Sequence, residues 1–186
     1  MPVRLPDLGW AFRAALLVAT LPLLAECGPG RNQFAPPCPN RAFLGDASDL
    51  NIYRSPNGPH AGFDLTDLVL HGRAIGIQGS CQPGDKKNQL AVSVMPGFEM
   101  TRGPAMVGRA IDVPVFVAVT EGGTILDKRL YNMHVVFPSN VDRVSLSPGR
   151  LDLTLPVTAT KSGAAYTILT GFQLTPDQLA ASRRGR

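Results

Sequence analysis

The chain has 186 residues, of which 44% are hydrophobic, 17% charged and 6% aromatic. This composition is too apolar for a disordered chain, and the glycines show no collagen period. Three cysteines are too few for a small disulfide-rich protein, and the length suits one domain. The net charge of +4 comes without a basic stripe interleaved with aromatic residues, which argues against nucleic-acid binding.

Residues 1–26 have the pattern of a bacterial export signal. Arg4 and Arg13 supply positive charge around the start of an apolar core that occupies residues 14–25. A membrane-spanning helix needs about 20 apolar residues, so this core is short for one. The sequence therefore predicts a signal peptide.

The leader ends in Leu24-Ala25-Glu26-Cys27, which resembles the lipobox of bacterial lipoproteins. The resemblance implies that Cys27 becomes the lipidated first residue of the mature protein, although Glu26 stands where that family prefers a small residue. It also implies a place in the cell envelope, anchored by lipid on the periplasmic side. Gly28 after the cysteine, rather than aspartate, favours the outer membrane. An uncleaved anchor and a soluble product of another cleavage are the alternatives.

A tether is predicted to follow the lipidated cysteine. Residues 28–37 contain two glycines and three prolines, a composition that forms neither helix nor sheet. Together with Cys27 they are expected to link the lipid flexibly to a folded domain at residues 38–180. Residues 181–186 hold three arginines and are expected to form a basic tail.

Cys38 and Cys81 lie within the predicted domain. Export would place them in an oxidising compartment, where disulfides persist, so we expect them to pair. The bond would close a loop of about 44 residues and contribute about 4 kcal/mol by the chain-entropy estimate. Two buried free thiols are the alternative. A zinc site is not expected, because neither cysteine belongs to a C-x-x-C pair.

Apolar residues alternate with polar ones in five segments, which is the pattern of half-buried antiparallel strands. A Gly-Gly hairpin turn at residues 122–123 separates two of them. Residues 68–79 also resemble a strand, but their three glycines predict a bulge or the close approach of another strand. The residues expected to face the core are Leu90, Val92, Val94, Phe98, Met100, Val113, Val115, Val117, Val119, Tyr131, Met133, Val135, Phe137, Leu151, Leu153, Leu155, Val157, Tyr166, Ile168, Phe172 and Leu174.

These segments predict an all-β fold. We expect an antiparallel β-sandwich, Ig-like or fibronectin-like, of about seven or eight strands, with a small closed barrel as the alternative. Thr175-Pro176-Asp177-Gln178 has the N-cap, first-turn proline and capping-box glutamine of a helix, so one short C-terminal helix is expected. Residues 45–50 are compatible with a further short turn or helix.

No motif in the sequence predicts catalysis. His60, His71 and His134 are isolated and lack metal-site spacing, and Ser80 does not sit in a nucleophile elbow. We therefore predict no enzyme activity, catalytic residue, cofactor or metal. Two other interpretations stay open. One is a periplasmic small-ligand-binding module with an apolar pocket, and the other is a hydrolase in which His71 or His134 meets a carboxylate and a serine.

Several segments of the domain carry a family resemblance, namely Cys38-Pro39, Asp64-Leu65-Thr66-Asp67-Leu68, Gly79-Ser80-Cys81, Pro114-Val115-Phe116-Val117-Ala118-Val119-Thr120, Lys161-Ser162-Gly163-Ala164-Ala165-Tyr166 and Gly171-Phe172-Gln173-Leu174-Thr175-Pro176. They resemble small uncharacterised lipoproteins of α-proteobacteria over most of residues 38–180. The resemblance implies an envelope location and carries over no catalytic residue. The predicted function is a structural or protein-interaction role in the envelope, with the membrane bound through the N-terminal lipid and an envelope protein as partner.

Overall fold

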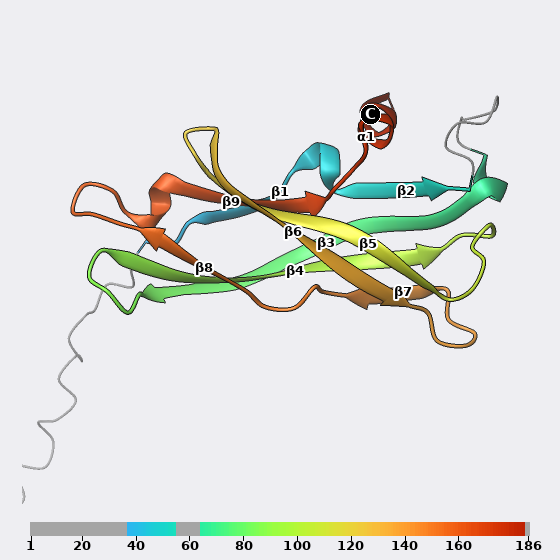
Figure 1. Cartoon of the computed structure of the whole chain (residues 1–186), viewed down its shortest axis with the longest axis horizontal. Helices are drawn as coiled ribbons and strands as arrows, with labels where there is room; N and C mark the ends of the chain where they lie inside the picture. The colour runs from blue at the N-terminus through green and yellow to red at the C-terminus, as the bar shows by residue number, and fades with distance from the viewer. Residues whose placement is uncertain (1–36, 55–63, 185–186) are drawn as a thin grey trace, which may run out of the picture. The chain divides into compact units, whose positions relative to one another are not determined.

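The computed structural model describes residues 37–54 and 64–184, which form two β-sheets packed face to face (Figure 1). The predicted all-β sandwich is confirmed. The described residues contain nine strands rather than seven or eight, because short strands were not foreseen in the sequence. The predicted leader, Cys27 and His60 lie outside the described residues.

Sheet A has the strand order β1-β9-β5-β6. Its two edges are therefore β1 and β6. Strand β1 runs parallel to β9, whereas the β9–β5 and β5–β6 pairs are antiparallel. The bounds of its strands are β1 Asn40–Phe43, β5 Ala110–Glu121, β6 Thr124–Val136 and β9 Tyr166–Phe172.

Sheet B has five antiparallel strands in the order β2-β3-β4, followed by two short strands that share one side of β4. The first half of β4 pairs with β8, and its second half pairs with β7. The bounds of these strands are β2 Asp49–Tyr53, β3 Leu68–Pro83, β4 Gln89–Arg102, β7 Arg143–Leu146 and β8 Leu151–Pro156.

The chain changes sheets soon after it enters the domain. After β1 in sheet A, a 3₁₀ helix (η1, Gly45–Ala47) turns the backbone toward β2 in sheet B. The Ala74 amide donates to the Ser48 carbonyl and so ties this crossing to β3. The turn or helix anticipated around residues 45–50 is η1.

The core lies between the sheets and follows the predicted alternation. One buried cluster joins Phe98 and Met100 of β4 to residues of β5, β6 and β9, and a second joins Leu90 and Val92 to β5, β8 and β9. Of the residues expected to face the core, Tyr131, Val157 and Leu174 are only partly buried. A third, smaller cluster forms on the outer face of sheet A, where Phe116 and Ala118 lie under Ala47.

The glycine-rich strand β3 has both features that its sequence predicts. Its register to β4 shifts between Ala74 and Gly76, so Ile75 is an extra residue and is half exposed. A Cβ atom at Gly72 would lie 2.8 Å from the Phe172 ring. The strand therefore bulges at one point and is closely approached by β9 at another.

The C-terminal helix α1 spans Pro176–Arg184 and begins with the predicted capping box. The Thr175 amide donates to Gln178 Oε1 at 2.9 Å, and the Gln178 amide donates to Thr175 Oγ1 at 3.3 Å. The helix extends into the segment expected to be a tail. Arg183 there forms an ion pair with Asp46 at 2.9 Å, which fastens α1 to η1.

The chain passes from sheet B back to sheet A between β8 and β9. Lys161-Ser162-Gly163 does not form a hairpin, because the strands on its two sides, β8 and β9, belong to different sheets. Ser162 instead precedes a 3₁₀ helix (η3, Gly163–Ala165). Lys161 Nζ donates to Glu121 Oε2 at 2.7 Å and lies over the Tyr166 ring. The hydrogen bond to Glu121 raises the pKa of the Lys161 ammonium, because it favours the charged form.

Candidate functional sites

A disulfide between Cys38 and Cys81 joins the two sheets, as the sequence predicts. The Cα atoms of the two cysteines are 5.8 Å apart. Cys38 lies two residues before β1 of sheet A, and Cys81 lies near the end of β3 in sheet B. On one side of the sandwich β1 and β3 face each other. The bond therefore joins the two sheets at one end of that side. Cys27, the predicted lipid attachment site, lies outside the described residues.

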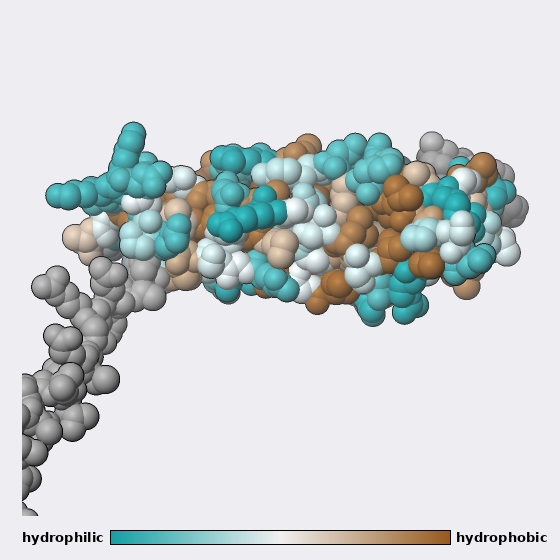
Figure 2. Space-filling model, turned by 90° about the horizontal axis from the view of Figure 1, so that it is seen from below, coloured by the Kyte–Doolittle hydropathy of each residue, from teal (hydrophilic) through white to brown (hydrophobic). Residues whose placement is uncertain are grey.

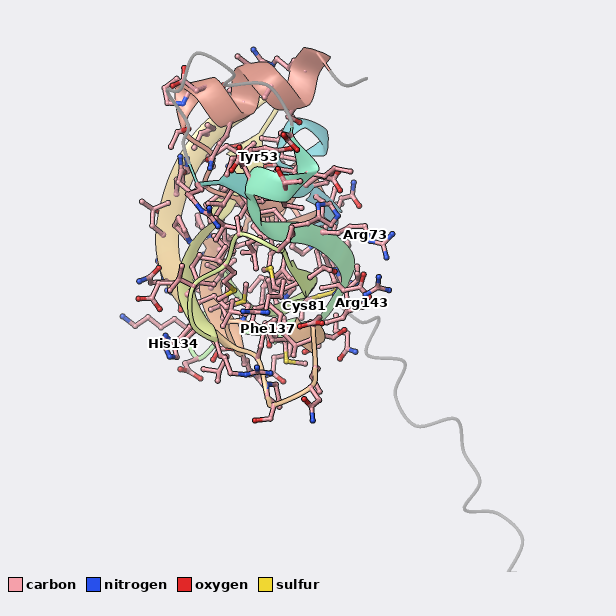
Figure 3. The ribbon with its side chains drawn as sticks, turned by 90° about the vertical axis from the view of Figure 1, so that its right-hand side faces the viewer. Tyr53, Arg73, Cys81, His134, Phe137 and Arg143 are labelled. Carbon is pink, nitrogen blue, oxygen red and sulfur yellow. A yellow bond between two sulfur atoms is a disulfide. The ribbon has the colours of Figure 1, made fainter. Side chains whose placement is uncertain are left out.

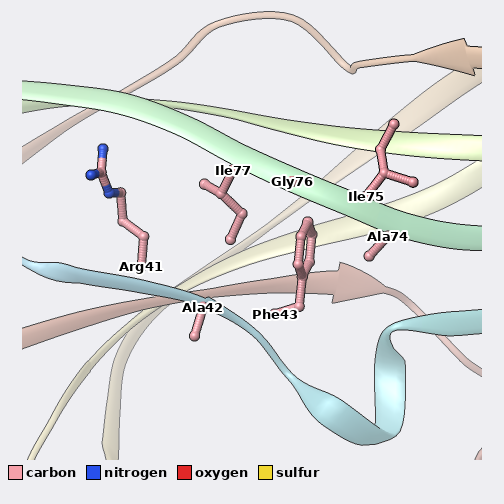
Figure 4. Close-up of a pocket in the computed structure, with 7 residues that line it drawn as sticks. All are labelled: Arg41, Ala42, Phe43, Ala74, Ile75, Gly76 and Ile77. Carbon is pink, nitrogen blue, oxygen red and sulfur yellow. The ribbon is translucent and has the colours of Figure 1, made fainter.

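Beyond the disulfide, β1 and β3 border a shallow hollow of about 330 Å³ (Figure 4). Within the described residues, β1 pairs only with β9, and β2 covers β3 only up to Arg73. Two strand edges thus face the hollow without a hydrogen-bonded neighbour there. Figure 4 shows Phe43 and Ile77 pointing into the space between these strands, with Arg41 at one end.

Arg41 lines this hollow and carries a positive charge. Its guanidinium lies beside Gly79, where a Cβ atom would be 2.6 Å from the Arg41 nitrogen and 2.4 Å from the Ser93 carbonyl oxygen. Gly79 thus leaves the room that the arginine occupies. In the described part of the chain, Arg41 has no acidic partner. Its guanidinium can therefore donate hydrogen bonds to a carboxylate or phosphate group that enters the hollow.

A second hollow, of about 540 Å³, lies on the other side of the bulge in β3. It is lined by the apolar side chains of Ile75, Met95 and Leu146. Gly97 also lines it, next to Ile75. Both hollows are open at the surface. Figure 2 likewise shows hydrophobic residues reaching the surface in patches separated by polar ones.

The two described histidines lie apart on outward-facing positions. His134 Nδ1 is 2.7 Å from Asp112 Oδ1 on the β5–β6 hairpin, and both side chains are exposed. His71 Nδ1 is 2.8 Å from the Asn51 side-chain oxygen in sheet B. Figure 3 shows His134 on the side of the sandwich opposite Arg73 and Arg143. The structure therefore brings one histidine to a carboxylate, but among the described residues neither histidine is hydrogen-bonded to a serine.

Within residues 37–54 and 64–184, no three His, Cys, Asp or Glu side chains lie together as a possible metal site. Over the same ranges, no helix has both the length and the apolar composition that crossing a membrane demands.

Strand β6 forms a long open edge of sheet A. It has 13 residues, and within the described chain it pairs only with β5. Its first half carries three large apolar side chains that are more than half exposed: Ile125 at 61%, Leu126 at 52% and Leu130 at 62%. We call the segment Leu126-Asp127-Lys128-Arg129-Leu130 the β6 edge motif.

The alternation at Tyr131, Met133, Val135 and Phe137 indicates only the second half of β6. Asp127-Lys128-Arg129 interrupts the alternation, and a register shift beside Val119 adds one residue to the strand. The Gly-Gly turn was the available signal. A two-residue hairpin pairs its flanking strands from the turn onward, so a strand that ends at Glu121 predicts another that begins at Thr124.

Comparisons of the chain with protein-family models, with curated proteins and with solved structures found no match.

Proposed function

We propose that the chain is a lipid-anchored protein of the cell envelope that binds another protein through the open edge of β6. The observation that carries the interaction role is the combination of an unpaired 13-residue edge with exposed apolar side chains. The anchor and the location are inferred from the sequence. The disulfide supports an oxidising compartment, such as the periplasmic side of the envelope.

An open edge of this length is unusual in a stable soluble domain. Unpaired amide and carbonyl groups along a strand are a template for another strand, and proteins commonly shorten, cover or charge such edges. The β6 edge motif has charges at its centre but exposes leucine on both sides of them. A partner strand added here would gain main-chain hydrogen bonds and would bury the leucines.

We expect Cys27→Ser to abolish lipid attachment. The full chain, expressed in a bacterium and labelled with radioactive palmitate, should incorporate label at Cys27 and fractionate with membranes. The serine variant should carry no label, because it has no thiol to acylate. Two acyl chains hold a protein firmly on a bilayer, whereas one binds only marginally.

The control for this experiment is the double variant Cys38→Ala with Cys81→Ala, which keeps Cys27. It should incorporate label as the wild type does. Label that persists after Cys27→Ser would refute the anchor while leaving the interaction role to be tested separately.

We expect a photoreactive residue on β6 to capture a protein in whole cells. Leu130→p-benzoylphenylalanine places the probe at the exposed edge, and illumination should give one discrete product larger than the chain. The matched control is the same replacement at Asp152, an exposed position on β8 in sheet B. Equal capture from both positions, or no capture from position 130, would refute a specific role for β6.

A further inference from the structure

We propose that the partner of β6 is the β6 strand of a second copy. The two strands would run antiparallel about a two-fold axis through Lys128, and the two four-stranded sheets A would become one continuous sheet. This inference rests on the proposed interaction role of β6 and names its partner.

The β6 edge motif is self-complementary about its central residue. In an antiparallel pair centred on Lys128, each residue faces the residue equally far from the centre on the other copy. Asp127 then faces Arg129, and Leu126 faces Leu130, each twice by symmetry. Such reciprocal contacts are what a two-fold interface requires.

Asp127 and Arg129 lie on one face of the strand, and Lys128 and Leu130 lie on the other, whereas Leu126 is the extra residue at the register shift. Asp127 and Arg129 are opposite Val119 and Val117 of β5, which face the core. Within one copy they already form an ion pair at 3.0 Å, with both side chains about half exposed. The second copy would extend this pair to four alternating charges. Facing residues in an antiparallel pair have Cβ atoms about 4.5–5.5 Å apart, which is close enough for these contacts.

In this register the two Lys128 residues face each other, but their ammonium groups lie apart. Its side chain lies over sheet A, away from the free edge. Lys128 Nζ donates to Gln173 Oε1 at 2.7 Å and lies 4.7 Å from the centroid of the Phe116 ring. The two ammonium groups would therefore point in opposite directions, each over its own sheet.

The neighbouring registers are disfavoured by the same charges. A centre at Asp127 would place the two aspartates face to face, and a centre at Arg129 would do the same with the two arginines. Like charges directly opposite each other destabilise a strand pair. A centre at Leu130 would leave Asp127 and Arg129 without opposite charges. Among these four registers, the one centred on Lys128 is therefore the one that places opposite charges face to face.

Cysteine crosslinking tests both the partner and the register. Two full chains are prepared in detergent, one with Leu126→Cys and one with Leu130→Cys, each with Cys27→Ser and a different affinity tag. Mixed and mildly oxidised, they should give a disulfide-linked dimer that carries both tags. Either chain alone should not, because identical positions would be about 13 Å apart at four residues' separation.

The outcomes decide the proposal. No crosslink in the mixture, or equal crosslinking of one chain with itself, would overturn it. Because Cys27 is absent throughout, the result does not depend on lipid attachment. A photocrosslink from position 130 to a different protein, without the cysteine crosslink, would keep the proposed function and overturn this inference. Circular dichroism of each variant establishes that the β-sheet fold is intact.

Charge reversal gives an independent test in chains that retain Lys128 and both leucines. Arg129→Asp should weaken self-association about tenfold in sedimentation equilibrium, because it turns two attractive pairs into repulsive ones. Asp127→Arg should do the same. The double reversal should restore self-association to within about threefold of the wild type, since each acid again faces a base. Single reversals without effect, or a double variant as weak as the single ones, would overturn the proposal.

Discussion

Phe98→Ala is expected to lower the free energy of unfolding by about 3–5 kcal/mol, which is the usual loss on truncating a fully buried phenylalanine. Phe98 lies on β4 with none of its surface exposed. Its ring centroid is 4.9 Å from that of Phe172 and 5.8 Å from that of Phe43, so it contacts aromatic residues contributed by sheet A. Alanine would leave a cavity between the sheets at this contact. Urea denaturation, followed by circular dichroism, measures the loss.

The matched control for Phe98→Ala is Val107→Ala. Val107 also carries an apolar side chain, but 91% of its surface is exposed. Its truncation should change the free energy of unfolding by less than about 0.5 kcal/mol. If Phe98→Ala lowered the free energy of unfolding as little as Val107→Ala is expected to, the packing of the two sheets would contribute little to stability.

The second large effect is expected from removing the disulfide. The double variant Cys38→Ala with Cys81→Ala should lose about 4 kcal/mol, because the bond closes a loop whose ends are 43 residues apart in the sequence. Replacing both cysteines avoids leaving a free thiol. Urea denaturation of the wild type under oxidising and reducing conditions gives the same comparison without substitution.

The structure also predicts where the loss appears first. Strand β1 pairs through four residues, and the disulfide holds the chain two residues before it. Hydrogen exchange in the double variant should therefore speed up at β1 before it does at β5. A loss below about 1 kcal/mol, with unchanged exchange at β1, would contradict a stabilising role for the bond.

The sequence predicted the fold class because most strands have one buried and one exposed face. Leu151, Leu153 and Leu155 of β8 are buried and alternate with exposed residues along the whole strand. Strands β1 and β7, with four residues each, are too short for such a pattern to be distinctive. The order of strands was not predictable, because alternation tells which face is buried but not which strand is adjacent.

The candidate sites were predictable only in part. The Cys38–Cys81 bond followed from the number of cysteines and the expected compartment. The hollow beside Arg41 did not, because its walls come from β1 and β3, which the sequence does not reveal to be neighbours. The β6 edge motif was missed for another physical reason. Edge positions are partly open to water on both faces, so Leu130 and Arg129 are both exposed and the alternation disappears.

The disulfide at the start of the domain has a mechanical consequence under the proposed lipid tether. A pull on the segment that precedes Cys38 reaches the domain first at that cysteine, and the covalent bond passes the force to β3. The four residues of β1 lie beyond this point, so their hydrogen bonds to β9 are shielded from the strain. Tension on the proposed tether would then be spread over the longest strand of sheet B, and the domain would resist being peeled open from its first strand.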